Sequence, residues 1–202
     1  MKLFKYLFAF CSIFLFTSCL VRTIYPLFED NEIVFEPKLI GKWMNNDSSE
    51  IWEFSKYKPD DTTRNPNKYR LQTIAIYKDG NKDTALFEAL TGMLGKNLFL
   101  DVTIDNREMI KQCSLNLRQS SHLIFTHIFY KVNFKDDSLC FVEMSKEWYT
   151  KNMKKLKISI LPRDEGDYVT LTSRTKQLQN FIKKYANNPK AFPESGYLHR
   201  ID

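Results

Sequence analysis

The sequence predicts a mainly β domain, built from antiparallel strands that follow one another along the chain, with an amphipathic helix near its C-terminus. Three observations lead to this prediction. Polar and apolar residues alternate through residues 68–73, the period-two pattern of a half-buried strand. Asp79-Gly80 then marks a tight hairpin turn. The chain also contains 16 Phe, 10 Tyr and 3 Trp but only 6 Gly, and abundant aromatic residues favour sheet.

The N-terminal residues form a leader in front of this domain. Lys2 and Lys5 precede an apolar run over residues 6–16, and two small residues, Thr17 and Ser18, follow it. A charged, then apolar, then small-residue order is typical of a secretory signal. The apolar run is too short to cross a bilayer, which needs about 20 such residues.

The end of the leader, Phe16-Thr17-Ser18-Cys19, resembles the lipobox of bacterial lipoproteins. The resemblance implies cleavage before Cys19 and attachment of lipid to the thiol and amine of that cysteine. It predicts a signal peptide over residues 1–18, a lipidated N-terminus and short tether over 19–36, and a folded domain over 37–202. It also predicts a bacterial cell-envelope location, with a lipid anchor in the outer membrane. The alternative is an ordinary secretory leader in which Cys19 is a chance residue.

The domain has an ordinary globular composition and a mild positive charge. The chain is 43% hydrophobic and 27% charged, near the average of folded domains. Its formal net charge of +6 falls to +4 when Lys2 and Lys5 leave with the leader. Nucleic-acid binding needs a concentrated basic face, so we expect no nucleic-acid partner. No long Ser/Gly linker follows Cys19, so we expect the domain to stay close to the membrane.

The first half of the domain is predicted to be a helical turn followed by hairpins. The turn covers residues 37–40 and leads into Gly41-Lys42-Trp43 and a short strand. Further strands cover 50–54, 68–76, a returning segment that ends near Leu90, and 97–103. Thr91-Gly92 is expected to break the returning strand. Residues 104–121 have no clean period, and we interpret them as a long connection.

The second half begins with strands predicted over 122–134 and 139–144. Ser145 is a candidate N-cap for a short helix that ends near Lys155, and further strands are predicted over 156–161 and 168–172. Four apolar residues then fall at helical spacing and predict an amphipathic helix on the outside of the sheet; they are Leu178, Phe181, Ile182 and Tyr185.

The segment Leu39-Ile40-Gly41-Lys42-Trp43, ahead of hairpins and a terminal helix, resembles the lipocalin pattern. The chain also resembles uncharacterised bacterial lipoproteins with lipocalin-like domains, through Trp52-Glu53-Phe54, Phe99-Leu100-Asp101 and residues 171–181. The resemblance implies an antiparallel meander that closes into a lipocalin-like barrel of about eight strands. In that family the tryptophan of the Gly-X-Trp motif plugs the closed end of the barrel.

The resemblance also assigns structural roles to individual residues. Gly41 and Trp43 would form the Gly-X-Trp motif, and an arginine near the end of the last strand would pack over Trp43. Arg174 stands before the predicted terminal helix and is the candidate for that arginine. The same residue would alternatively lie in the first turn of the helix.

Few residues are candidates for a catalytic or ligand-binding role. Glu88 lies between Leu86 and Leu90 on a predicted strand and is either an inward carboxylate or an exposed strand position. His127 shares a strand face with Phe129, so we interpret it as a core histidine in preference to a ligand. We expect no metal site, no cofactor and no catalytic constellation.

The remaining cysteines and the function are left with alternatives. Cys113 and Cys140 either pair in the exported protein or stay free, with Cys140 buried as a small apolar residue. The first functional hypothesis is a lipid-anchored barrel that binds a small apolar ligand, since an eight-stranded barrel either holds one such ligand or is filled by side chains. The second is a filled barrel that serves as an envelope protein-interaction or structural module. An enzyme that uses Glu88 or His127 is the third.

Overall fold

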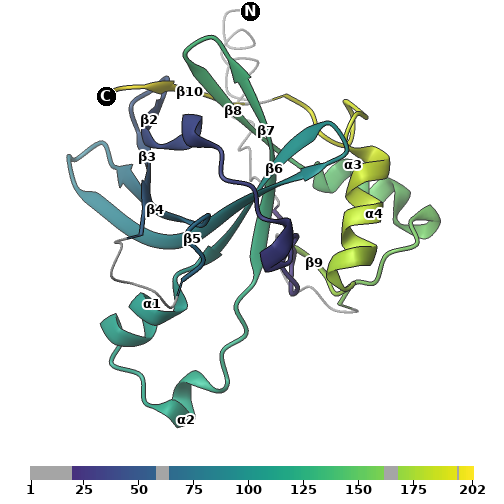
Figure 1. The fold of residues 1–202 in the computed structure, drawn as a ribbon, viewed down its shortest axis with the longest axis horizontal. Coiled ribbons are helices and arrows are strands. Elements are labelled where there is room, and N and C mark those ends of the chain that lie inside the picture. The colour runs from purple at the N-terminus through teal and green to yellow at the C-terminus, as the bar shows by residue number, and fades with distance from the viewer. Residues whose placement is uncertain (1–19, 58–63, 162–167, 195) are drawn as a thin grey trace, which may run out of the picture.

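A closed antiparallel barrel of eight strands forms the body of the protein (Figure 1). The computed structural model describes residues 20–57, 64–161, 168–194 and 196–202. The predicted signal peptide and the lipidation site Cys19 therefore lie outside the described residues. The barrel strands are β2 (Gly41–Asn45), β3 (Glu50–Lys56), β4 (Tyr69–Ile76), β5 (Lys82–Leu94), β6 (Asn97–Ile104), β7 (His127–Lys135), β8 (Ser138–Glu143) and β10 (Tyr197–Arg200).

Antiparallel pairing runs without interruption around the barrel. Strands β2 to β8 pair in chain order, β6 and β7 included, and β10 pairs with β8 on one side and β2 on the other. The predicted mainly β fold, an antiparallel meander closed into a barrel of about eight strands, is confirmed. Closure leaves no unpaired strand edge in the barrel, which protects such a sheet from pairing with other chains.

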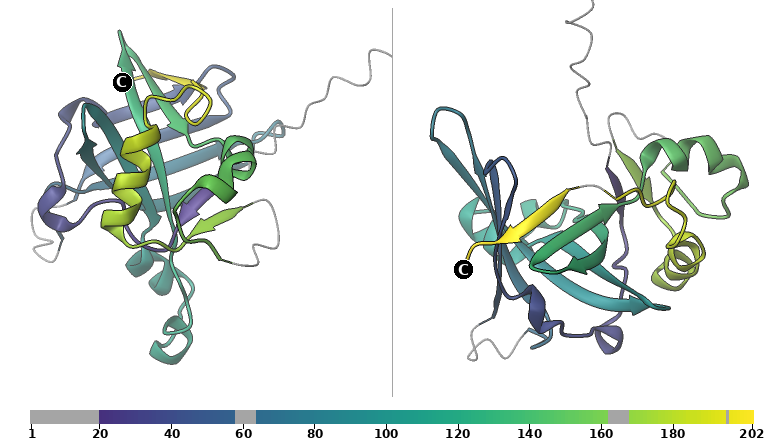
Figure 2. Two further views of the ribbon diagram at one scale, coloured as in Figure 1. Left: turned by 90° about the vertical axis from the view of Figure 1, so that its right-hand side faces the viewer. Right: turned by 90° about the horizontal axis from the view of Figure 1, so that it is seen from above.

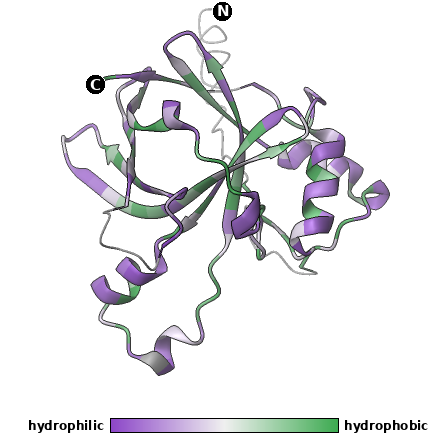
Figure 3. Ribbon diagram, in the orientation of Figure 1, coloured by the Kyte–Doolittle hydropathy of each residue, from purple (hydrophilic) through white to green (hydrophobic). Residues whose placement is uncertain are grey.

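Alternate side chains along each strand point into the barrel, as the two-residue period of a strand requires. They form one buried cluster with Leu39 and Trp43 at one end and aromatic residues in the middle. A second cluster lies outside the wall. Hydrophobic and hydrophilic bands alternate along the strands accordingly (Figure 3).

The second cluster is covered by helices. Helix α4 (Thr175–Tyr185) packs Leu178, Phe181 and Ile182 against outward residues of the wall, among them Phe99 and Phe129. Helix α3 (Lys146–Asn152) contributes Tyr149 and continues into the short helix η3 (Met153–Lys155). Figure 2 shows α4 lying across the outside of the barrel, as predicted.

Residues 24–36, here called the N-terminal strap, run along the barrel wall and contact α4 at Pro26, Leu27 and Glu32. The backbone N–H of Leu27 donates to the Asp101 carboxylate at 2.6 Å, and its carbonyl accepts from Gln179 of α4 at 3.0 Å. The strap contains the short helix η1 (Asp30–Glu32) and leads into η2 (Pro37–Leu39). Part of the segment expected to be a tether is therefore packed into the fold.

Several predicted boundaries are wrong. Strand β5 runs through Gly92 to Leu94, because the chain turns at Gly95 instead. The connection 104–121 contains α1 (Asn106–Gln112) and α2 (Leu117–Ser120), and β7 starts only at His127.

The two strands predicted before the terminal helix do not enter the barrel. Residues 156–161 make one isolated bridge, from Ile160 to Leu171. Strand β9 (Val169–Leu171) instead pairs with β1 (Val21–Thr23) outside the barrel. The eighth barrel strand is β10, which follows the terminal helix.

Candidate functional site

One end of the barrel is closed by Trp43. Its side chain is 3% exposed, and its indole N–H donates to the carbonyl of Leu39 in η2 at 2.9 Å. The guanidinium of Arg200 lies 4.4 Å from the centre of the Trp43 ring. Arg200 also donates to the carbonyls of Lys38 at 2.8 Å and Ile40 at 3.0 Å. The arginine thus ties the last strand, the plug and the helical turn together.

Gly41 makes this arrangement possible. Its φ of +130° is a backbone conformation that L side chains rarely adopt. A Cβ at this position would collide with the guanidinium of Arg200. The Gly-X-Trp spacing therefore reflects close approach of an arginine as well as the position of the tryptophan.

The assignment of Arg174 to the position over Trp43 is wrong. Arg174 is the exposed N-cap residue of α4, on the outside of the barrel. The error has a topological cause, because the last barrel strand comes after the helix and carries Arg200 opposite Trp43.

Aromatic rings from opposite walls meet in the middle of the barrel. The Phe141 ring lies 4.8 Å from that of Trp52 and 6.0 Å from that of Phe54, and Trp52 lies 5.7 Å from Tyr130. Burial, together with the nearby carboxylates of Glu143 and Glu50, raises the pKa of the Tyr130 phenol. Side chains therefore fill the barrel at this level.

The end opposite Trp43 is more open to solvent. Phe87 and Ile128 face inward there but are only partly buried. The indole N–H of Trp52 is buried and has no hydrogen-bond acceptor among the described residues. A buried donor without an acceptor costs about 1–3 kcal/mol, so a ligand oxygen at this position would be stabilised.

Glu88 does not point into the barrel. Its neighbours Phe87 and Ala89 belong to the interior cluster, so Glu88 faces outward. There its carboxylate pairs with Lys68 at 2.9 Å and Arg64 at 3.0 Å. The inward alternative is therefore wrong, and Glu88 is an outward but partly buried member of an ion cluster on the outer wall.

The rest of the ion cluster is deeply buried. The side chain of Arg64 is 7% exposed and pairs with Asp105 at 2.9 Å, while its guanidinium stacks 4.1 Å above the Tyr57 ring. Burial and the carboxylates of Asp105 and Glu88 raise the pKa of the Tyr57 phenol. These groups satisfy one another's hydrogen bonds and charges, so the cluster is suited to holding Tyr57 and Arg64 against the barrel wall.

His127 also lies on the outer face, since its neighbour Ile128 packs against the interior cluster. Its Nδ1 lies 2.9 Å from the carboxylate of Asp101, which is 1% exposed and accepts from Leu27 of the strap. His127 is therefore a hydrogen-bonded histidine under the strap and not a residue of the barrel interior.

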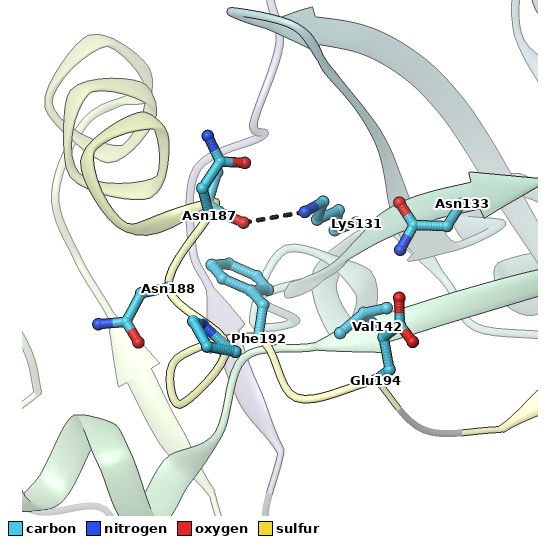
Figure 4. Close-up of a pocket in the computed structure, with 9 residues that line it drawn as sticks. Lys131, Asn133, Val142, Asn187, Asn188, Phe192 and Glu194 are labelled. Atoms are coloured by element: carbon cyan, nitrogen blue, oxygen red, sulfur yellow. Dashed lines mark hydrogen bonds between the residues drawn. The ribbon is translucent and has the colours of Figure 1, made fainter.

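A hollow of about 320 Å³ lies outside the barrel, between β7, β8 and the chain that follows α4 (Figure 4). Val142 and Phe192 form its apolar floor, and Lys131, Asn133 and Glu194 supply polar groups. Lys131 donates to the carbonyl of Ala186 at 3.1 Å. This mixture of an aromatic floor and hydrogen-bonding groups suits a small polar ligand or one side chain of a protein partner.

Neither the thiols nor the metal-binding residue types form a site in the described part of the chain. Cys113 is exposed and Cys140 is buried, and no disulfide joins them, so the pairing alternative is wrong. No group of three or more His, Cys, Asp and Glu side chains among these residues could hold a metal ion. No helix in the described ranges is long and apolar enough to cross a membrane.

Comparison of the chain with protein-family models, with curated proteins and with solved structures finds no match. Its function is therefore inferred from its residues and their geometry.

Proposed function

We propose that the protein is a lipoprotein of the bacterial cell envelope, anchored in the outer membrane by lipid on Cys19. Its lipocalin-like barrel acts as a filled module that contacts other envelope components through its outer surface. The observation that carries this proposal is the contact between Phe141 and the rings of Trp52 and Phe54 across the barrel. These rings occupy the space that an apolar ligand would need in the middle of the barrel.

The start of the described chain supports the anchoring part of the proposal. The carbonyl of Leu20 accepts from the N–H of Val169 at 3.0 Å, and β1 begins at Val21. Cleavage before Cys19 would leave these contacts in place. The lipid would then sit one residue from the fold, so the barrel would be held against the membrane.

Fractionation of cells tests the anchor. The full chain is expected in the membrane fraction, whereas the variant C19S is expected to leave it. The matched control is C11S, which makes the same change inside the leader and should fractionate like the parent. Equal membrane association of the C19S and C11S variants would contradict lipidation at Cys19.

Crosslinking in cells tests the interaction part. A photoreactive residue at Asn188, on the rim of the hollow outside β7 and β8, is expected to give a reproducible adduct with an envelope protein. The control position is Lys78, in the hairpin between β4 and β5. Absence of a reproducible adduct from Asn188, or the same adducts from both positions, would contradict a partner at this hollow.

A second candidate function is favoured by the buried, unbonded indole N–H of Trp52. In this version a small, mainly apolar ligand with one hydrogen-bond acceptor binds at the open end of the barrel. Native mass spectrometry of gently purified protein would then show a bound small molecule. The variant W52F removes the donor and should lose that molecule, and a parent protein that carries none would exclude this version.

A further inference from the structure

Strands β1 and β9 extend the sheet beyond the barrel strand β7 and carry the start of the described chain. Strands β1 and β9 pair in parallel, with Arg22 beside Thr170. Residues 159–161 extend along the other side of β9, where Leu161 donates to Thr170 and Thr172 donates to Ser159. The chain that would begin at Cys19 therefore enters the fold at β1, and only β9 separates β1 from residues 159–161.

One face of these strands is turned away from the second hydrophobic cluster and from α4, since Val21 and Leu171 point into that cluster while Arg22 stands opposite the inward residue Ile128. This face is amphipathic. Tyr168 and Leu161 are large apolar residues that are 44% and 39% exposed on it. The Arg22 guanidinium lies over the Tyr168 ring at 4.7 Å, and Lys157, four residues before Leu161, is exposed at the free edge of these strands. We call Arg22, Lys157, Leu161 and Tyr168 the anchor-side face.

Lysines continue from the free edge of these strands onto α4. Lys155, Lys157 and Lys184 line a hollow of about 310 Å³ whose floor includes Phe181 and Tyr185. No carboxylate lines the hollow, and within the described ranges no ion pair engages these three ammonium groups. Converging cations without counter-charges favour an anion.

We infer that the anchor-side face and the lysine hollow beside it lie on an anionic bilayer surface, with headgroup phosphates bound by Lys155, Lys157 and Lys184. This inference rests on the proposed lipidation of Cys19. The strand spacing of about 4.8 Å and rise of about 3.3 Å per residue put Lys157 roughly 20 Å along and 10 Å across from Leu20. A flat membrane that holds the lipid on Cys19, next to Leu20, therefore extends far enough to contact Lys157.

The residue types match the chemistry of a bilayer surface. Tyrosine is enriched where lipid headgroups meet water, and Tyr168 and Leu161 would supply shallow apolar contact. Each lysine close to an anionic surface strengthens binding by about fivefold, with a steep dependence on salt. The lipid would hold the protein at the membrane, and this face would set its orientation.

The test uses the mature chain without lipid, residues 19–202 with C19S, which retains the barrel and both hydrophobic clusters. Co-sedimentation is measured with phosphatidylcholine vesicles that contain or lack phosphatidylglycerol. The double variant K155Q/K157Q is compared with K78Q/K82Q, which removes the same charge from the β4–β5 hairpin on the opposite side of the barrel from α4 (Figure 1).

We expect salt-sensitive binding to the vesicles that contain phosphatidylglycerol. The variant K155Q/K157Q should lower the partition coefficient by roughly 30-fold, and K78Q/K82Q should leave it unchanged. The inference would be overturned by equal losses in both variants or by binding that does not depend on phosphatidylglycerol. Absence of binding to either vesicle would also overturn it and would point to a protein on this face. Because the chain tested has no lipid, a failure here is distinct from a failure of the fractionation test on Cys19.

Discussion

Replacing Arg200 with alanine should destabilise the barrel more than the same replacement of Arg174, an exposed arginine outside the barrel. The change removes the cation over the Trp43 ring and two hydrogen bonds, to the carbonyls of Lys38 and Ile40. It also opens the seam between β10 and β2, where Arg200 stands opposite Trp43. The matched control is R174A, since Arg174 caps α4 without a side-chain cap bond.

The magnitude follows from these contacts. A partly exposed cation–π contact contributes about 0.5–1 kcal/mol, and a hydrogen bond from a charged donor contributes about 1.5–3 kcal/mol. The side chain of Arg200 is 35% exposed, and water can replace part of each bond. We therefore expect a loss of about 2–3 kcal/mol for R200A, against less than about 0.5 kcal/mol for R174A.

Urea unfolding followed by tryptophan fluorescence measures both values. An unchanged slope with urea would show that the unfolded states are comparable. For a domain of this size, the expected loss lowers the melting temperature by about 5–10 °C. If R200A and R174A unfold at the same urea concentration, the role given to the arginine over Trp43 is wrong.

Three further predictions concern packing and titration. A Cβ at Gly92 would lie 2.5 Å from the Phe28 ring, so G92A should lower the free energy of unfolding by about 1–3 kcal/mol; an unchanged melting temperature would mean that the strap shifts freely. Cys113 should react with a thiol reagent in the native protein and Cys140 only after denaturation; simultaneous reaction would contradict the burial of Cys140. Burial raises the pKa of Tyr149 from 10.0 to about 12. Since the unfolded state loses this proton first, the free energy of unfolding should fall as the pH rises from 10 to 12. Urea unfolding across that range measures the fall, which Y149F should weaken. An equal fall in Y149F would exclude Tyr149 as its cause.

Local patterns predicted most of the barrel. Alternation over residues 68–73 predicted most of β4, and the hydroxyl of Ser145 accepts from the N–H of Trp148 as an N-cap should. The stripe on α4 predicted its buried face. In each case the sequence pattern lies within a few residues along the chain, where spacing determines geometry.

Features that depend on distant residues were missed. Residues 197–200 form a strand of only four residues, which is too short to be recognised without the strands beside it, so Arg200 was not found. Arg64 and Asp105 are 41 residues apart, and no local pattern joins them. The inward or outward direction of Glu88 depended on which face of β5 closes around the core, and apolar residues occupy both faces.

The mass of the mature N-terminus tests the central claim, export to a lipid anchor at Cys19, most directly. The protein would be purified from membranes in detergent and its N-terminal peptide analysed by mass spectrometry. A peptide that begins at Cys19 with fatty acids on its thiol and amine is the predicted result. A mature chain that begins at any other residue, or at an unmodified Cys19, would contradict it.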